Sequence, residues 1–330
     1  MPSSELKANA ASTSLTDETK KVLKEVSDRF AYEDNAFKVL TGKSTKIITG
    51  FGPTNAPTAG TLSVMFGVYR LQQTLSIPLT IIISDLGAWN SRNLPWSVLE
   101  ATAQKMIRFL HAVYPHHSQV EIRTHLDTAN LIRAGKIARF LTLDDLMKFK
   151  ESLQELYRQH NLLGSDVGMV VDTLYTVADV LEPAEQEYEN ILMVSGFEEG
   201  YFVDLSKIVL KNIKASKDIT LPMHAEIGAL FFQVIEGFSG YPKMSKSIPQ
   251  SAVNLNQSEE EIKYKLLSDE PNDQKTIFTC MRFASRWDEA MIENARRAFM
   301  SRTTNGADWE LVKQMYVDEF VGLKKIWHES

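Results

Sequence analysis

Hydrophobic and polar positions follow two patterns along the chain, and each predicts a different kind of element. Short apolar runs rich in β-branched residues predict buried parallel strands, whereas apolar residues three to four positions apart predict amphipathic helices. Strands are expected at 45–49, 79–84, 120–123 and 190–195. Helices are expected at 18–43, 62–73, 98–113, 128–163, 169–182 and from about 258 to the end, with residues 1–17 loosely held.

Alternation of strands and helices favours an α/β protein with a parallel sheet. The chain has 330 residues, 44% hydrophobic and 24% charged, which is an ordinary globular composition. No apolar run approaches the length of a membrane span, and Met1–Lys20 lacks the apolar core of a secretory signal. The single cysteine, Cys280, excludes an internal disulfide and a cysteine-based zinc site, and its apolar neighbours predict a packing role. We therefore expect a cytoplasmic protein without a membrane partner.

The most informative stretch is Lys243-Met244-Ser245-Lys246-Ser247, between Pro242 and Pro249. Gly and Pro around it indicate a loop. Two ammonium groups on a loop suit a polyphosphate whose charge grows in a transition state. A solvated basic turn is the simpler interpretation of such a run taken alone.

A second phosphate-type segment, 50–61, lies between a predicted strand and a predicted helix. Backbone N–H groups at a helix start favour anions, and Gly50, Gly52 and Gly60 allow close backbone approach to a ligand. Thr58 or Thr61 is expected to cap the helix. The spacing matches neither common glycine-rich nucleotide fingerprint, so an ordinary strand–helix turn is the competing interpretation.

Together the two segments resemble the paired signatures of class I aminoacyl-tRNA synthetases, in detail those of the tryptophanyl/tyrosyl subgroup. The second signature of that family is intact at 243–247. In the first, Pro53-Thr54-Asn55 stands at the family's turn and Thr58-Ala59-Gly60-Thr61 at its His-x-Gly-His tetrad, with neither histidine present.

The resemblance extends to two further stretches. Val177-Ala178-Asp179-Val180-Leu181 is similar to the helix whose aspartate reads the polar atom of the substrate side chain. The segment from Gly196 through Glu198 and Glu199 stands where the family holds the ribose and the amino-acid end of the adenylate.

The resemblance implies a Rossmann-like fold with an inserted helical segment and a C-terminal helical domain. It divides the chain into an N-terminal extension, partly helical (1–40), a domain that binds ATP and the amino acid (41–240), and the signature loop with helices (241–330). The implied reaction is activation of an amino acid by ATP to an aminoacyl adenylate, with Mg²⁺ as cofactor and no protein metal site. The family also implies a homodimer.

The implied site residues form three groups. Lys243, Lys246, Thr58 and Thr61 are the catalytic candidates, and the hydroxyls of the two threonines would replace imidazole donors without carrying charge. The candidates for ATP binding are Gly50, Gly52, Pro53, Gly60, Gly196, Glu198, Met244, Ser245 and Ser247. The candidates for substrate binding are Ile48, Asp85, Tyr175, Thr176, Asp179 and Glu199.

Asp85 is a candidate on its own evidence, because polar groups after parallel strands line ligand crevices, with a structural N-cap as its other possible role. Asp172 and Ile48 stand where family members have aromatic residues, so strict tryptophan or tyrosine specificity is not implied.

Three hypotheses follow: a synthetase that charges tRNA, a paralogue that passes the acyl group to a non-tRNA acceptor in a biosynthetic pathway, and a non-catalytic binding protein. The intact lysine signature opposes the last. A net charge of −6 and a pI near 5.7 leave tRNA binding open.

Overall fold

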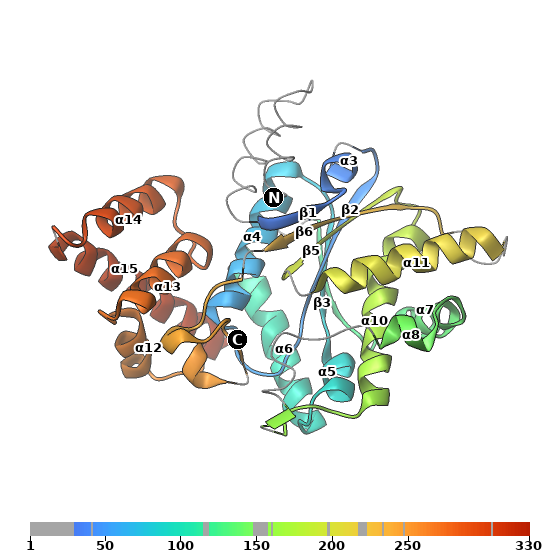
Figure 1. The fold of residues 1–330 in the computed structure, drawn as a ribbon, viewed down its shortest axis with the longest axis horizontal. Helices are drawn as coiled ribbons and strands as arrows, with labels where there is room; N and C mark the ends of the chain where they lie inside the picture. Colours follow the sequence, from blue (N-terminus) through green and yellow to red (C-terminus); the bar gives the residue numbers. More distant parts are fainter. Residues whose placement is uncertain are drawn as a thin grey trace. The chain divides into compact units, whose positions relative to one another are not determined.

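A computed structural model describes residues 30–40, 42–114, 119–147, 158–159, 161–196, 199–216, 223–232, 234–246, 248–304 and 306–330. Two compact units are formed by the described residues (Figure 1). The first comprises those of Met1–Thr54, Arg70–Ile107 and His116–Gln233, and the second those of Asn55–Tyr69, Arg108–Pro115 and Val234–Ser330.

The first unit is built on one six-stranded sheet. Its order is β1 (Phe30–Asp34), β6 (Glu226–Phe232), β5 (Asn190–Gly196), β2 (Thr45–Phe51), β3 (Leu79–Ile83) and β4 (Val120–Thr124). All neighbouring strands pair in parallel except β1, which pairs antiparallel with β6. From β2 in the middle of the sheet, the chain runs through β3 to β4 at one edge, and then crosses back to β5 on the other side of β2. Such a reversal of strand order leaves a crevice at the carboxyl ends of the central strands.

The predicted α/β fold with a Rossmann-like parallel sheet and a C-terminal helical region is confirmed. The four predicted strands correspond to β2, β3, β4 and β5. The edge strand β4 exposes Glu121, whereas β2, β3 and β5 are buried along almost their whole length, and β3 is buried at every residue from Leu79 to Ile83. This is the pattern of a strand covered on both faces.

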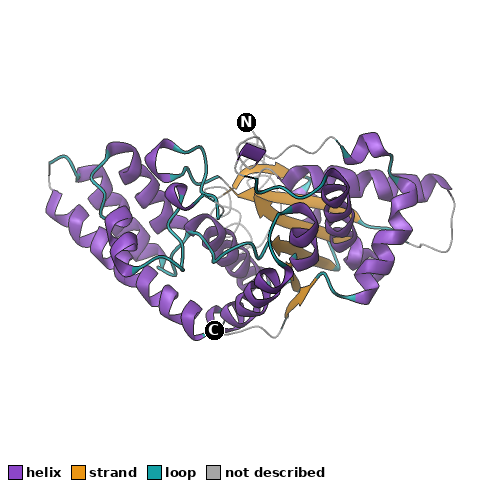
Figure 2. Ribbon diagram, turned by 90° about the horizontal axis from the view of Figure 1, so that it is seen from below, coloured by secondary structure: helices purple, strands orange, loops and turns teal. Residues whose placement is uncertain are grey.

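The helices of the first unit are α3 (Ala36–Leu40), α5 (Asp85–Ser91), α7 (Thr128–Ile137), η1 (Ala138–Phe140), α8 (Leu143–Leu146), α10 (Asp166–Glu185) and α11 (Gly200–Ser216). Helices α3, α10 and α11 pack against strands, and α5 and α7 pack against α10 (Figure 2). Helix α10 contacts β2 and β5, and α11 contacts β5 and β6. Alternate strand residues such as Ile191, Met193 and Ile227 pack with both helices into one buried cluster. Burial of this face is the main source of stability for the sheet.

Two long helices, α4 (Ala59–Leu75) and α6 (Trp96–Val113), each contribute residues to both units. The rest of the second unit consists of η3 (Phe238–Gly240), η4 (Pro249–Ser251), α12 (Glu259–Leu266), α13 (Pro271–Phe283), α14 (Glu289–Ser301) and α15 (Gly306–Glu329). The predicted helical region from 258 is thus confirmed. Cys280 is buried in α13, and burial raises the pKa of its thiol, which agrees with a packing role.

One prediction about the N-terminal region is wrong. The continuous helix expected over 18–43 is interrupted, because Phe30–Asp34 is a strand and only Ala36–Leu40 is helical. Residues 18–29 and 41 lie outside the described residues. Phe30 and Tyr32 pair with Phe232 and Phe231 of β6, so a contact distant in sequence decides the structure here.

Within the inserted segment 128–163, α7, η1 and α8 confirm helical structure, and 148–157 and 160 lie outside the described residues. None of the helices in the described part of the chain is long and apolar enough to cross a membrane.

Candidate functional site

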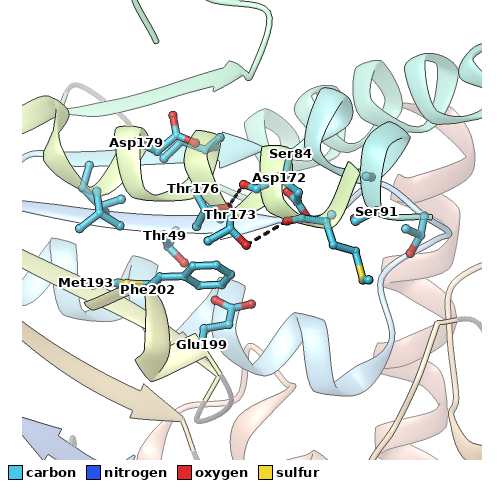
Figure 3. A pocket seen from close by; sticks show the side chains of 18 of the residues that line it. Thr49, Ser84, Ser91, Asp172, Thr173, Thr176, Asp179, Met193, Glu199 and Phe202 are labelled. Carbon is cyan, nitrogen blue, oxygen red and sulfur yellow. Dashed lines mark hydrogen bonds between the residues drawn. The ribbon is translucent and has the colours of Figure 1, made fainter. Parts of the chain in front are cut away.

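A pocket opens in the first unit around the central strands β2, β3 and β5 (Figure 3). Strand β2 and the turn after it contribute Ile48, Thr49, Gly50 and Gly52. Thr54 follows in the same turn, and Ile82 and Ser84 come from β3 and the residue after it. The remaining lining residues are Ala88, Ser91 and the C-cap Arg92 at α5, Met169, Asp172, Thr173, Thr176, Asp179 and Val180 on α10, Met193 on β5, and Glu199 and Phe202 at the start of α11. The Thr49 hydroxyl is buried and has no hydrogen-bond partner among the described residues.

Helix α10 presents one face to this pocket. Its lining residues are spaced three or four apart, so they stack along a single stripe: Met169, Asp172, Thr173, Thr176, Asp179 and Val180. Ser165 caps the helix by accepting a hydrogen bond from the Gly168 amide. The hydroxyls of Thr173 and Thr176 donate back to the carbonyls of Met169 and Asp172, at 2.9 and 3.0 Å.

Asp179 lines the pocket, and each of its oxygens already has a protein partner. Oδ1 accepts from Arg123 at 2.8 Å, and Oδ2 lies 2.7 Å from Nε2 of His125. Arg123 also donates to Glu182. In Figure 3 the Asp179 carboxylate lies on the other side of α10 from Phe202.

The charges of this cluster are largely withdrawn from solvent: the exposed fractions of the Arg123 and Asp179 side chains are 11% and 5%. Burial lowers the pKa of Arg123, but Asp179 and Glu182 raise it by more, so the guanidinium stays charged.

His125 is held in one orientation by two backbone contacts. The Gly87 amide donates to its Nδ1 at 3.1 Å, and the amide of His125 itself donates to Asp85 Oδ1 at 3.0 Å. A backbone N–H can only donate, so this contact favours an unprotonated Nδ1 and a proton on Nε2, which faces Asp179. Burial lowers and Asp179 raises the pKa of His125, with a net increase. A second proton on Nδ1 must nevertheless break the bond from Gly87.

Asp172 is half-buried, whereas Asp179 is buried. A Cβ atom placed on Gly87 would lie 2.1 Å from Asp172 Oδ1, so the absence of a side chain on α5 makes room for this carboxylate. Burial raises the pKa of Asp172, and His125, Ser91 and Arg92 oppose that increase without cancelling it.

Within the second unit, residues 55–61 of the first signature segment lie against the lysine loop (residues 243–246) and the chain that follows it. The amide of Ala59 donates to Val253 at 3.0 Å and that of Leu255 donates to Pro57 at 3.2 Å. A Cβ atom on Gly60 would lie 3.6 Å from Cβ of Met244. Main-chain pairing therefore joins the start of α4 to the chain that follows the lysine loop.

Thr58 caps α4, as the sequence predicts for one of the two threonines. Its Oγ1 accepts from the Thr61 amide at 3.2 Å and lies 3.2 Å from the Thr61 hydroxyl. Thr58 is buried. The two hydroxyl groups thus lie side by side at the start of α4, where the free backbone N–H groups of a helix favour anions.

The lysine loop is braced by a buried serine. Ser251 Oγ accepts from the Ser245 amide at 2.9 Å and donates to the Ile248 carbonyl at 2.8 Å. Gly237 allows the chain to converge here, because a Cβ atom on it would lie 2.8 Å from the Lys243 carbonyl and 2.9 Å from that of Ser251. The loop carrying Lys243 and Lys246 is therefore shaped by main-chain contacts on both sides.

The structure distributes the predicted residues as follows. Ile48, Gly50, Gly52, Thr176, Asp179 and Glu199 line the pocket of the first unit. Gly60, Thr58, Thr61 and the loop 243–246 gather in the second unit. Pro53, Gly196, Asp85 and Tyr175 are not among the pocket-lining residues. Glu198 and Ser247 lie outside the described residues.

Asp85 and Tyr175 support the pocket instead of lining it. Asp85 is buried, and its carboxylate accepts hydrogen bonds from the backbone amides of His125 and Leu86. The Tyr175 ring packs edge-on against His125, with centroids 5.7 Å apart. Ser84, one residue earlier, occupies the N-cap position of α5 that the sequence offered as the other role for Asp85.

Sequence reasoning missed Arg123 and His125 as the partners of the pocket residue Asp179. Both lie at the carboxyl end of β4, two positions apart and hence on one face of the strand. Polar residues at that end of a parallel strand were the available signal, the same one that drew attention to Asp85.

Among the described residues, no group of three or more His, Cys, Asp or Glu side chains is arranged to hold a metal ion. Mg²⁺ needs only one or two protein carboxylates when substrate phosphates and water complete its shell. The residues present are compatible with a magnesium ion carried in on a nucleotide.

Comparisons with known proteins place the fold. No protein-family model matches the chain, and no curated protein matches its sequence. Solved structures do match. Tyrosyl-tRNA synthetase from Archaeoglobus fulgidus, complexed with L-tyrosine, aligns with a TM-score of 0.69 at 14% identity, over 94% of this chain and 99% of that one.

Tryptophanyl-tRNA synthetase from Encephalitozoon cuniculi, bound to tryptophan, also aligns with a TM-score of 0.69 at 14% identity, over 98% of this chain and 95% of that one. Tryptophanyl-tRNA synthetase from Giardia lamblia aligns with a TM-score of 0.60 at 16% identity, over 94% of this chain and 81% of that one. The resemblance first seen in the signature segments thus extends along nearly the whole chain, which has the fold of the tyrosyl- and tryptophanyl-tRNA synthetases.

Proposed function

We propose that the chain activates an amino acid with ATP, forming an aminoacyl adenylate and pyrophosphate, and transfers the activated acyl group to tRNA. The fold is that of synthetases, at 14% identity. The activity itself is argued from the residues.

The observation that carries the proposal is the contact between the two signature segments, which are far apart in sequence: the Asn55 side-chain amide donates to the Lys246 carbonyl at 3.3 Å. In addition, the backbone of 57–59 is hydrogen-bonded to that of 253–255, which follows the lysine loop. Two lysines on a braced loop beside a capped helix start form a setting for phosphate groups. A solvated basic turn would not require this main-chain pairing.

The expected chemistry is an in-line attack of the amino-acid carboxylate on the α-phosphorus of ATP, with pyrophosphate leaving. Positioning and charge stabilisation then supply most of the rate. Lys243 and Lys246 would hold the phosphates, with Lys246 compensating the charge that develops in the transition state. Thr58 and Thr61 can donate hydroxyl hydrogen bonds but carry no charge, so Mg²⁺ bound to the nucleotide and the lysines would supply the positive charge.

The pocket of the first unit is the proposed site for the amino acid. It lies at the reversal of strand order, where open α/β sheets bind ligands. Its lining combines apolar walls from Ile48, Met193 and Phe202 with a few polar groups, which is the usual make-up of a small-molecule site.

ATP–pyrophosphate exchange tests the proposal directly. Purified chain is incubated with ATP, Mg²⁺ and labelled pyrophosphate, and each amino acid is added in turn. Label should enter ATP with one amino acid or a small group of them. If no amino acid supports exchange, the activity is refuted and a binding protein on this scaffold is the better interpretation.

Charging of total tRNA tests the acceptor. Acylation with the amino acid that supports exchange is the expected result. If exchange occurs and no tRNA becomes acylated, the acceptor is a different molecule, such as a small amine, and mass spectrometry of products formed with candidate amines would identify it.

A further inference from the structure

The side chain of Lys265 contacts the chain on both sides of the lysine loop. Lys265 lies on α12, and its ammonium group donates hydrogen bonds to the carbonyls of Pro249 and Ala252, the first residue and the C-cap of η4. The same nitrogen lies 6.0 Å from the centre of the Phe238 ring in η3. Because η3 precedes residues 243–246 and η4 follows them, one cation joins the two arms of the loop.

The turn that Lys265 holds is also the turn that braces the loop. Ser251 lies in η4, and its buried hydroxyl accepts the hydrogen bond of the Ser245 amide. The main-chain bonds between residues 57–59 and residues 253–255 begin immediately after η4. A displacement of η4 would therefore disturb both the lysine loop and the pairing with the start of α4.

The positive charge of Lys265 suits this position. The carbonyl groups of a single helical turn need partners from outside the turn, and the Pro249 carbonyl accepts from the Ala252 amide across a long 3.4 Å. Hydrogen bonds from an ionised donor are about twice as strong as those between neutral groups. Lys265 is half-buried, which lowers its pKa, and Glu261 and Asp273 oppose that decrease. An ammonium group that is drawn from water toward backbone oxygens indicates a role in holding η4.

Helix α12 itself is held in place by other residues. Ile262 and Leu266 are fully buried, and the helix contacts α15. Ser258 caps its first turn and forms a capping box with Glu261. Loss of the ammonium group of Lys265 should therefore leave the fold of the second unit intact.

We propose that Lys265 is a positioning residue for adenylate formation: its ammonium group holds the two arms of the loop that carries Lys243 and Lys246, so that the loop keeps one conformation during the reaction. The inference rests on the proposed function in assigning the two loop lysines to the phosphates of ATP. Lys265 acts through the backbone of the loop. A misplacement of about 1 Å can cost a factor of roughly 100 in rate, so the shape of the loop matters as well as its charges.

Hydrogen exchange tests the brace without requiring catalysis. Lys265→Met keeps the length of the side chain and removes the ammonium group, and Lys263→Met makes the same change at an exposed position of α12. The reporter is a peptide with the hydrogen-bonded amides of Met244, Ser245 and Ile248. Its exchange should become about 10- to 100-fold faster in Lys265→Met, because charged hydrogen bonds that oppose local opening are lost, and should not change in Lys263→Met. Equal rates in Lys265→Met and wild type would overturn the inference.

ATP–pyrophosphate exchange tests the consequence for the reaction. With the amino acid that supports exchange, Lys265→Met should lower kcat about 10- to 100-fold. It should leave KM for that amino acid within about twofold, because the residues of the amino-acid pocket belong to the first unit. Lys265→Arg, which keeps a charged donor, should recover most of the lost rate. An unchanged kcat in folded Lys265→Met would show a merely structural lysine and overturn the positioning role.

Circular dichroism establishes that each variant is folded at the assay temperature. If Lys265→Met is unfolded, Lys265→Gln replaces it, because its amide donates to a carbonyl without positive charge, and both effects should be smaller and in the same direction. Absence of wild-type exchange with every amino acid would refute the proposed function, and hydrogen exchange would then decide the inference by itself. Active wild type with an unaltered Lys265→Met would uphold adenylate formation and overturn the inference alone.

Discussion

The side-chain amide of Asn55 donates a hydrogen bond to the main-chain carbonyl of Lys246, across 3.3 Å. Asn55 belongs to the first signature segment and Lys246 to the second, so one side chain links them. The relay continues outward: Asn256 donates to Asn55 at 3.0 Å, and the indole of Trp327 donates to Asn256 at 2.8 Å. Helix α15 is thereby connected to the backbone of the lysine loop.

Replacing Asn55 with aspartate should loosen this link. The carboxylate retains an acceptor for the amides of Ala56 and Asn256, but it loses the donor to Lys246 and faces that carbonyl with a negative charge. Because one hydrogen bond contributes about 1 kcal/mol, ATP–pyrophosphate exchange should fall roughly 5- to 20-fold. Gln314→Glu, which alters an exposed amide on α15, should leave the rate unchanged. Equal rates for Asn55→Asp and wild type would show that the link does not position the loop.

Lys246→Ala tests the chemistry assigned to the loop. Removing a charge that acts in the transition state should lower exchange by about 10²- to 10³-fold, with no change in the thermal unfolding midpoint. Lys263→Ala removes an exposed lysine from α12 in the same unit and should retain full activity. Near-normal exchange in Lys246→Ala would reject its assigned role.

Gly87→Ala should destabilise the first unit. The added Cβ would lie 2.1 Å from Asp172 Oδ1 and 2.9 Å from His125 Cε1, so both must move. We expect a loss of about 1–3 kcal/mol in the free energy of unfolding by urea, typical of overpacking. Gly135→Ala is the contrasting variant, because it lies in α7 with no atom within 4 Å of the new Cβ. That change should be neutral or stabilise the protein by up to about 1 kcal/mol.

Arg123→Met should be far more damaging than its size suggests. It leaves Asp179 and Glu182 buried without the guanidinium that pairs with both, which costs about 3–5 kcal/mol in comparable clusters. Arg296→Met breaks an exposed pair with Glu293 and should produce no measurable change in the urea midpoint. Adding Asp179→Asn to Arg123→Met should recover part of the loss, and the absence of any recovery would mean that charge is not the cause.

The raised pKa of Asp172 implies a pH dependence of stability. A carboxyl group that binds its proton more tightly in the folded state stabilises that state at low pH, and this contribution is lost as the pH rises from its ordinary value through the raised one. Asp172→Asn cannot ionise, so its stability relative to wild type should increase as the pH rises from about 4. Urea titrations between pH 4 and pH 8 would measure this difference, and a constant difference would indicate that Asp172 ionises normally.

Much of the fold follows from local pattern. The four predicted strands and the helices from 62, 98 and 169 correspond to elements of the structure. A continuous apolar run reflects a strand buried on both faces, and apolar residues at helical spacing reflect a helix buried on one face, so both can be read from local sequence. Strand β1 could not be predicted in this way, because Phe30 and Tyr32 are held in extended form by pairing with Phe232 and Phe231 of β6, far away in the chain. Pairing at that distance leaves no local signal.

The residues of the candidate site show the same division. The sequence by itself determined that a glycine-rich turn, a helix with Asp179 and a loop with two lysines occur in an order that resembles a synthetase, because the order and spacing of motifs can be read along the chain. Only the tertiary structure decided that Asn55 donates a hydrogen bond to the Lys246 carbonyl and that Arg123 and His125 contact the two oxygens of Asp179. It also decided that the Asp172 carboxylate lies against Gly87. The charge state and availability of a carboxylate depend on its neighbours within a few ångströms, and the fold brings those neighbours from different strands and helices.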